Sequence, residues 1–446
     1  MNILILNGSP KGENSITLQT LLYLQKKFPG QQWKTLHVGQ KIKALEKDFS
    51  PALEALAKAD LLLFSYPVYT FIAPSQLHRF IELMKEHQVD VSSKLATQIT
   101  TSKHFYDTTA HRYIQDNCGD LGLHYIPGLS ADMEDLTTEK GRSDAENWWK
   151  HLLWSAENRH FAPVYPAVPV TNPVPVTPAE DIGVEKKGDV VIIADLQPED
   201  TQLQAMVDRF RAKLPYATRV VNIREFPFRG GCLGCFQCAV SGKCIYSDRF
   251  DDFLRNEIQT ADAMIYAFTI QDHSMGARFK MYDDRQFCNG HRTVTIGMPV
   301  GYLISGNLSK EENLRTIIEG RAQVGSNILT YVATDEFDTD RDVDRLVSEL
   351  NYSLENKNTG PQNFLGIGGM KIFRDLIYQM RGFMRADHQF FKSHGQYDFP
   401  QKKWPQSLAM YLVGAMIANP KIQKKMGGKM NEGMLMPYKK VLDDME

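Results

Sequence analysis

Four cysteines on one short stretch are the residues of this sequence best suited to redox or metal chemistry. Thiolates this close can surround a single compact inorganic centre, and C-x2-C-x2-C runs are typical of iron–sulfur sites. Structural zinc more often takes two C-x2-C pairs separated by a long loop, and a disulfide knot suits a secreted chain. The spacing C-x2-C-x2-C-x5-C favours an iron–sulfur cluster, with zinc and four unliganded cysteines as the alternatives. The four residues are Cys232, Cys235, Cys238 and Cys244.

A second candidate site is the loop between the first predicted strand, residues 2–6, and a helical pattern over residues 18–24. Small and hydroxyl-bearing residues at this point of an α/β fold hold phosphate, because the helix N-terminus supplies free N–H groups and a positive dipole. The glycine spacing is that of neither a dinucleotide-binding loop nor a P-loop, and the alternative is a plain turn with Ser15 as the helix N-cap. The candidate phosphate-binding residues are Ser9, Lys11, Asn14, Ser15 and Thr17.

Two further loops are expected beside this one. Apolar runs alternate with helical patterns along residues 1–150, which predicts a doubly wound parallel α/β sheet. Ligands of such sheets bind beyond the carboxyl ends of the strands. The loops after the predicted strands 61–65 and 95–100 should therefore converge on the same crevice. Their candidate binding residues are Pro67, Val68, Tyr69, Thr70, Thr101 and Ser102.

These residues carry a resemblance to a known family. Asn7-Gly8-Ser9-Pro10 with Ser15 and Thr17, followed by Pro67-Val68-Tyr69, resembles the NAD(P)H-dependent FMN reductases of flavodoxin-like fold. The resemblance implies FMN, with its phosphate at the first loop and its isoalloxazine against the other two. It also implies NAD(P)H as the electron donor, for which the sequence shows no binding motif of its own.

From Asp189 onward the order of strands and helices repeats, which we interpret as tandem duplication of a flavodoxin-like unit. The predicted elements are a strand at 190–194, a helix at 201–214, a strand at 219–223, the cysteine loop, a helix at 250–258, a strand at 263–268, and the segments 293–298 and 301–309.

The second unit resembles the iron–sulfur flavoprotein branch of the same family, which implies a 4Fe–4S cluster on the four cysteines. The resemblance rests on the cysteine motif and on Ala261-Asp262, Lys280, Asp284-Arg285 and Ser305-Gly306. Where a phosphate loop would stand, this unit has the acidic segment 195–200, whose carboxylates repel a phosphate. We therefore expect one FMN, in the first unit, with the cysteines close to it in this chain or a neighbouring one.

The predicted domain organisation has four parts. They are flavodoxin-like domains at residues 1–155 and 189–358, a proline-rich linker at 156–188, and a helical, basic, methionine-rich tail at 359–446. An apolar helix over residues 408–418 is too short to span a bilayer. We expect it to pack on the body or on a partner subunit, and residues 362–446 to support packing or a homo-oligomer.

Composition limits the partners. A formal net charge of -2 gives no indication of a nucleic-acid partner, and the apolar stretches are too short for a signal peptide or a membrane span. The sequence therefore predicts a cytoplasmic protein without membrane attachment. We interpret it as a flavin-dependent oxidoreductase that passes electrons from NAD(P)H through FMN and an iron–sulfur cluster to a small-molecule or protein acceptor. The alternatives are a plain flavin or quinone reductase without a cluster and a non-catalytic electron-transfer flavoprotein, and the sequence identifies no catalytic side chain.

Overall fold

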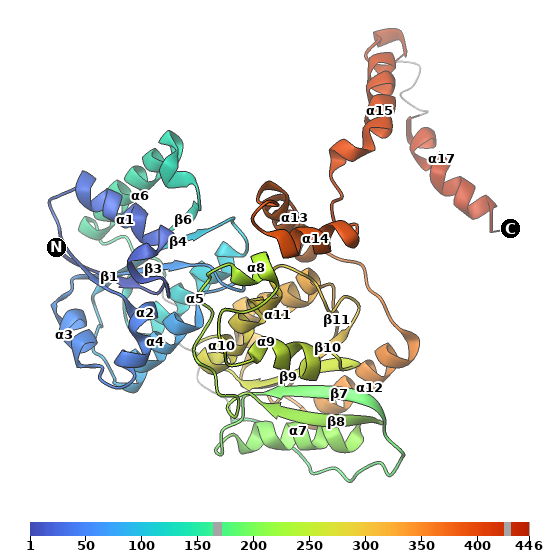
Figure 1. The fold of residues 1–446 in the computed structure, drawn as a ribbon, viewed down its shortest axis with the longest axis horizontal. Coiled ribbons are helices and arrows are strands. Elements are labelled where there is room, and N and C mark those ends of the chain that lie inside the picture. The colour runs from blue at the N-terminus through green and yellow to red at the C-terminus, as the bar shows by residue number, and fades with distance from the viewer. Residues whose placement is uncertain (164–171, 423–429, 446) are drawn as a thin grey trace. The chain divides into compact units, whose positions relative to one another are not determined.

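A computed structural model describes residues 1–163, 172–422 and 430–445 (Figure 1). The chain divides into two compact parts, Met1–Phe390 and Phe391–Glu446. Within the first part, residues 1–157 form one sheet with its helices, here called the first lobe, and residues 187–356 form another, the second lobe. Of the proline-rich linker predicted over residues 156–188, positions 164–171, which include Pro166 and Pro169, lie outside the described residues.

The first lobe is a parallel sheet with the strand order β2-β1-β3-β4-β5, and β6 pairs with β4. Its order is the 2-1-3-4-5 of flavodoxin-like folds. The strands are β1 (Asn2–Asn7), β2 (Gln32–Leu36), β3 (Leu61–Pro67), β4 (Leu95–Ser102), β5 (His124–Tyr125) and β6 (Leu129–Asp132). The helices are α1 (Ile16–Lys27), α2 (Val38–Leu45), α3 (Ser50–Lys58), α4 (Ser75–Glu86), α5 (Asp107–Asp120) and α6 (Glu139–Glu157).

The apolar runs of the central strands explain why they sit inside this sheet. In β1, Leu4 and Leu6 pack into one buried cluster, whereas Ile3 and Ile5 pack into another on the opposite face. The sequence of a strand that is buried on both faces is a continuous apolar run, as is usual for parallel sheets.

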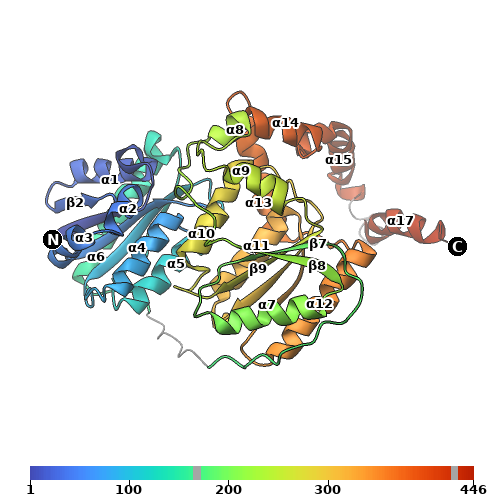
Figure 2. The same cartoon turned by 60° about the horizontal axis from the view of Figure 1, so that its bottom comes forward.

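The second lobe repeats this strand order as β8-β7-β9-β10-β11, again all parallel. Its strands are β7 (Lys187–Ala194), β8 (Tyr216–Asn222), β9 (Ala263–Thr269), β10 (Pro299–Ser305) and β11 (Ile328–Thr334). On one face of the sheet lie α7 (Thr201–Lys213) and α12 (Thr339–Asn356), and on the other lie α10 (Gly276–Arg285) and α11 (Glu312–Gly325) (Figure 2). The predicted fold class, two flavodoxin-like parallel sheets with a helical C-terminal region, is confirmed, while duplication stays an interpretation.

The predicted order included residues 293–298 as a segment without a stated structure. They form a turn, with the Met298 N–H donating to Thr295 O at 3.1 Å. The strand β10 begins only at Pro299, consistent with a proline that has no N–H to give to the ladder.

The two lobes share a continuous core. Leu77 and Phe80 of α4 belong to the same buried cluster as Phe279 and Tyr282 of α10. The carboxylate of Glu82 on α4 also accepts the N–H of Ala277 at the start of α10, at 2.6 Å. The packing of α4 against α10 therefore fixes how the lobes meet.

The α-helices that the structure describes after the second lobe are α13 (Phe364–Gln379), α14 (Arg385–Ser393), α15 (Trp404–Ile417) and α17 (Met430–Asp443). The helix predicted over residues 408–418 corresponds to α15, which buries none of its side chains, so that Tyr411 is 79% exposed. No helix in the described ranges is long and apolar enough to cross a bilayer. The role of the predicted tail stays a prediction.

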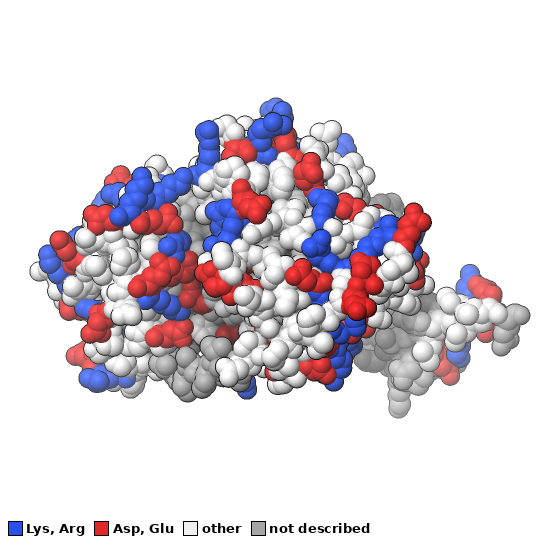
Figure 3. All heavy atoms as spheres, turned by 90° about the horizontal axis from the view of Figure 1, so that it is seen from below, with Lys and Arg blue, Asp and Glu red and all other residues white. Residues whose placement is uncertain are grey.

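Charged side chains of both signs are interspersed on the face drawn in Figure 3. Several charges are instead gathered where the lobes meet. His273 of the second lobe lies between two carboxylates, with Nδ1 3.0 Å from Glu311 Oε1 and Nε2 3.0 Å from Asp120 Oδ2. The ammonium of Lys85 lies 2.8 Å from both Asp120 and Asp272. This cluster joins α4 and α5 of the first lobe to the second.

We predict that raising the pH weakens this junction. Burial alone lowers the pKa of His273, but its hydrogen bonds to Asp120 and Glu311 outweigh burial and raise the pKa to about 10. Because the pKa of His273 is raised above its ordinary 6.5, the contribution of this residue to folding stability is complete below about pH 6.5. That contribution is lost as the pH rises through about 10. Urea unfolding of the wild type and His273→Gln should therefore show a stability difference that shrinks between pH 6.5 and 10. The exposed His160→Gln is the control, and a difference independent of pH would contradict the assignment.

Candidate functional site

The loop after β1 is held by its own side chains. The buried Asn7 donates through Nδ2 to Gly12 O at 2.8 Å and accepts the N–H of Ser9 at 3.2 Å. Gly12 has φ +57°, where a Cβ would collide with Gln40, so the turn requires glycine. A short 3-10 helix, η1 (Gly12–Asn14), then delivers the chain to α1, whose N-cap Ser15 accepts the N–H of Leu18 at 3.4 Å.

Four of the five predicted phosphate-binding residues line one cavity. They are Ser9, Lys11, Ser15 and Thr17, at the N-terminus of α1. Thr17 Oγ1 lies 2.6 Å from Thr101 Oγ1, which ties this loop to the end of β4. Asn14 is exposed and does not line the cavity, because η1 turns its side chain outward.

The loop after β3 forms the next wall. Pro67, Val68, Tyr69 and Thr70 all line the cavity, together with Thr101 and Ser102 from β4. Tyr69 and Ile72 exchange backbone hydrogen bonds of 2.8 and 3.1 Å across a tight turn. Its inner residues, Thr70 and Phe71, have φ of +39° and +77°, a region that costs free energy for residues other than glycine.

A buried ion pair of the second lobe holds this turn. Lys280 on α10 donates to Tyr69 O at 2.9 Å and to Thr70 Oγ1 at 2.6 Å, and it pairs with Asp284 one turn further along. Asp284 accepts Thr70 Oγ1 at 2.5 Å and the N–H of Ser75 at 2.8 Å. Both charged side chains are fully buried. The strained turn of one lobe is thus set by charges of the other.

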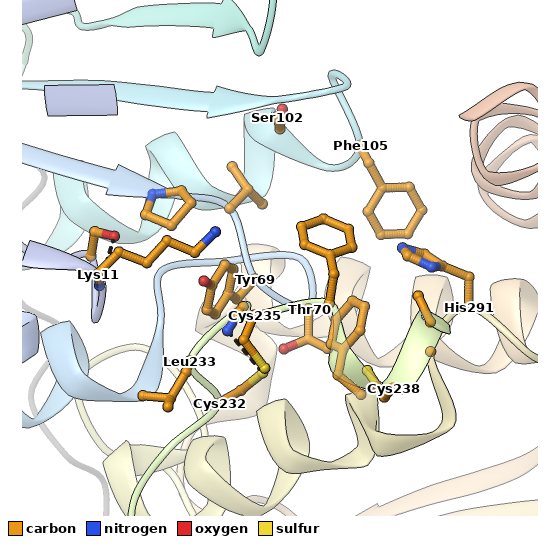
Figure 4. Close-up of a pocket in the computed structure, with 18 of the residues that line it drawn as sticks. Lys11, Tyr69, Thr70, Ser102, Phe105, Cys232, Leu233, Cys235, Cys238 and His291 are labelled. Atoms are coloured by element: carbon orange, nitrogen blue, oxygen red, sulfur yellow. Dashed lines mark hydrogen bonds between the residues drawn. The ribbon is translucent and has the colours of Figure 1, made fainter. Parts of the chain in front are cut away.

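The cysteine loop connects β8 to β9 and reaches the same cavity. It carries α8 (Gln237–Ser241) and leads into α9 (Phe250–Phe253) and the π-helical turn η3 (Leu254–Ile258). Gly234, with φ +58°, packs so closely on Tyr69 that a Cβ there would collide with the phenol oxygen. All four cysteines line the cavity: Cys232, Cys235, Cys238 and Cys244. Figure 4 shows the first three.

The cysteine loop carries four thiols, two of which have hydrogen-bond donors beside their sulfur atoms. Among the described residues no three His, Cys, Asp or Glu side chains converge closely enough to hold one metal ion. A cubane separates its thiolates more widely than one ion does, and its sulfurs favour nearby hydrogen-bond donors. Such donors are present, since the Gly234 N–H points at Cys232 Sγ at 3.5 Å and Arg285 lies 3.9 Å from Cys244 Sγ. Burial raises the pKa of Cys238 to about 11.

The side chain of Lys11 extends from the loop after β1 toward the cysteine loop. Figure 4 shows it extending toward Tyr69 and the cysteines. Its Nζ lies 5.7 Å from the centre of the Phe236 ring, within cation–π range. Burial lowers the pKa of Lys11, and the nearby Cys235 and Cys232 oppose that change. The Lys11 amine can therefore reach both a phosphate at the loop after β1 and the cysteine loop.

The cavity fits a flavin mononucleotide in its chemistry. Its empty space is about 1370 Å³, including the part open to solvent. Hydroxyl groups, an ammonium and a helix N-terminus stand at one end, where a phosphate can bind. Apolar and aromatic side chains such as Val68, Tyr69 and Phe236 line the rest, as a planar ring system requires.

The corresponding loop of the second lobe is closed by its own carboxylates. Asp195 pairs with Arg224 at 2.5 Å, and burial raises the pKa of Asp195 despite that partner. The N–H of Gln197 donates to Asp200 Oδ2 at 2.8 Å. An amide that a phosphate would use is thus already occupied.

The sequence analysis missed part of the cavity wall. Ile372, Phe373 and Leu376 of α13 line it, and Phe373 stacks on Phe105 of the first lobe with 4.4 Å between ring centres. The apolar spacing of α13 was visible but was interpreted as packing alone. His291 also lines the cavity, and a single histidine in a loop gives no spacing from which to predict it.

Comparison with known proteins gives three kinds of similarity. Residues 1–152 match the sequence family described as "Flavodoxin-like fold". An "Iron-sulfur flavoprotein" of Archaeoglobus fulgidus is 23% identical over 175 residues, which are 37% of this chain and 78% of that protein. A solved FMN-dependent NADH-azoreductase of Bacillus anthracis is 12% identical with a TM-score of 0.28. The match covers 36% of this chain and 99% of the azoreductase chain. A solved NADH:FMN oxidoreductase in the apo form is 20% identical with a TM-score of 0.32. The match covers 37% of this chain and 96% of that structure.

We predict that Lys280→Met strongly destabilises the protein. Removing one partner of a buried ion pair leaves an uncompensated charge, which costs about 3–5 kcal/mol. The free energy of unfolding in urea is the measurement. Lys140→Met is the matched control, because Lys140 forms an (i, i+4) pair with Asp144 but is 86% exposed. Equal losses in the two variants would show that the buried pair does not hold the lobes.

Proposed function

We propose that this chain is an FMN-dependent oxidoreductase that takes electrons from NAD(P)H and passes them through an iron–sulfur cluster to a small-molecule or protein acceptor. The observation that carries the proposal is the single cavity lined both by the hydroxyl-rich loop after β1 and by all four cysteines. Neither feature alone would distinguish an electron-transfer enzyme from a phosphate-binding or metal-binding protein.

The first lobe would hold the flavin. Ser9, Ser15 and Thr17 would bind the phosphate with the N–H groups of α1, and Lys11 would neutralise its charge. The turn of Tyr69 and Thr70 would lie against the ring. FMN supplies both hydride and single-electron chemistry, and the residues that hold it fix its position. The match of residues 1–152 to a flavodoxin-like family supports this assignment.

The cysteine loop would hold the cluster. Support comes from the chemistry of four soft thiol donors on one loop and from the relative of Archaeoglobus fulgidus, which is an iron–sulfur flavoprotein by name. Arg285 is fixed beside Cys244 by its ion pair with Asp248, at 2.7 Å, so it is positioned to stabilise negative charge there.

A plain flavin or quinone reductase without a cluster is the second candidate. The family match covers residues 1–152, which include the loop after β1 but not the cysteines, and so supports a flavin site by itself. Bound iron and sulfide distinguish the two candidates, since only the first requires them.

We predict one FMN per chain, bound through the loop after β1. Ser9→Asp should abolish flavin retention, because it places a like charge beside the phosphate. Gln197→Glu adds the same charge to the corresponding loop of the second lobe and should leave the flavin bound. Absorbance of FMN released from the purified protein gives the stoichiometry, and two FMN per chain would contradict the assignment.

We also predict that the double variant Cys235→Ala, Cys238→Ala loses its iron and sulfide and keeps its FMN. Iron, acid-labile sulfide and FMN are counted per chain after anaerobic purification. Cys118→Ala is the control, because Cys118 is buried in the first-lobe core and should change none of the three. Wild-type protein with FMN but without iron or sulfide would favour the plain reductase.

A further inference from the structure

His291 stands at the wall of the cavity with one ring nitrogen held. Its Nδ1 lies 2.9 Å from Asp387 Oδ2 on α14. Among the described residues its Nε2 has no hydrogen-bond partner, and the residue lines the cavity. In Figure 4 the ring lies on the side of the cavity opposite Lys11. One nitrogen is thus oriented by a carboxylate, and the other is available to a ligand.

The carboxylate that orients this ring is built into the fold. Asp387 is fully buried, and it also accepts the backbone N–H of His291 at 3.2 Å. Gly290, with φ +63°, makes room for it, because a Cβ there would collide with Asp387 Oδ1. Arg292 adds a positive charge 3.6 Å away. Three consecutive residues of one loop therefore enclose this carboxylate.

Aromatic neighbours fix the plane of the imidazole. The ring of Phe373 meets it edge to face with 4.7 Å between centres, and that of Phe287 does so at 5.5 Å. A second, smaller cavity shares His291, Phe105 and Phe373 with the first. His291 therefore stands in the wall between the cavity assigned to the flavin and an adjoining space where an acceptor can enter.

We propose that His291 is the acid–base residue that delivers a proton to an acceptor which takes up protons with its electrons, such as a quinone, and that Asp387 positions it. The proposal rests on the proposed function. Reduction of a quinone to a hydroquinone takes up two electrons and two protons. NAD(P)H supplies both electrons and one proton, so the second proton must come from another donor. That proton leaves His291 Nε2 as the new O–H bond forms, and the ring regains it from water. Asp387 stabilises the protonated ring and keeps hydrogen on Nδ1.

Two acceptors separate this role from a structural one. Ferricyanide takes one electron and no proton, whereas 1,4-naphthoquinone takes both. With the FMN-loaded full chain, His291→Gln should lower the ratio of quinone to ferricyanide turnover by about 100-fold, a usual size for general acid catalysis. Asp387→Asn should lower the ratio in the same direction. His160→Gln, an exposed histidine elsewhere, should leave it unchanged. A ratio unchanged in His291→Gln would overturn the proposal.

Nitrogen-15 NMR of histidine-labelled protein tests the geometry without turnover. His291→Gln assigns the signal by removing it. The neutral wild-type ring should carry its hydrogen on Nδ1, and Asp387→Asn should move it to Nε2, because an amide can donate to Nδ1. A wild-type ring with its hydrogen on Nε2 would overturn the proposal even if a variant failed to fold. Wild-type protein without FMN or turnover with either acceptor would refute the proposed function instead, leaving the NMR result to decide the orientation of His291.

Discussion

The buried pair of Lys280 and Asp284 is the interaction on which the site depends. Neither charge reaches water, so each must be compensated inside the protein. The compensation comes from the other lobe, through the carbonyl of Tyr69, the hydroxyl of Thr70 and the N–H of Ser75. These groups can be reached only if the turn adopts its positive-φ conformation at Thr70. The docking of the two lobes therefore also sets the shape of the cavity wall formed by this turn.

The same docking brings the cysteine loop to the first lobe. Once α4 and α10 are packed together, Gly234 meets Tyr69 and Gln76 Nε2 donates to Cys232 O at 3.2 Å. Association of separate subunits would cost translational and rotational freedom, whereas lobes of one chain avoid that cost. The contact between the hydroxyl-rich loop and the cysteines is thus independent of protein concentration.

The sheets were predictable from local sequence patterns. Strands that are buried on both faces consist of continuous apolar runs, and the alternation of these runs with helices indicates a parallel sheet. Where a residue's position depends on packing far along the chain, the sequence offered no comparable signal. Asp387 meets His291 across 96 positions, and only the docking of α14 brings them together. Residues 293–298 belonged to the predicted order of segments, but they form a turn, and β10 begins only at Pro299. Asn14 had the right residue type, but η1 faces it to solvent.

The two lobes share a strand order but contribute different residues to the cavity. In the first lobe the amides and hydroxyls after β1 face the cavity, whereas in the second Asp200 fills the corresponding position with a carboxylate of its own chain. This internal carboxylate satisfies the N–H of Gln197 without a ligand, whereas the first lobe keeps an open site. What the second lobe provides instead lies on its β8–β9 loop and on α10, both of which contact the first lobe. Its sheet therefore serves as the scaffold from which cysteines, a buried lysine and a histidine reach a cavity that begins in the other lobe.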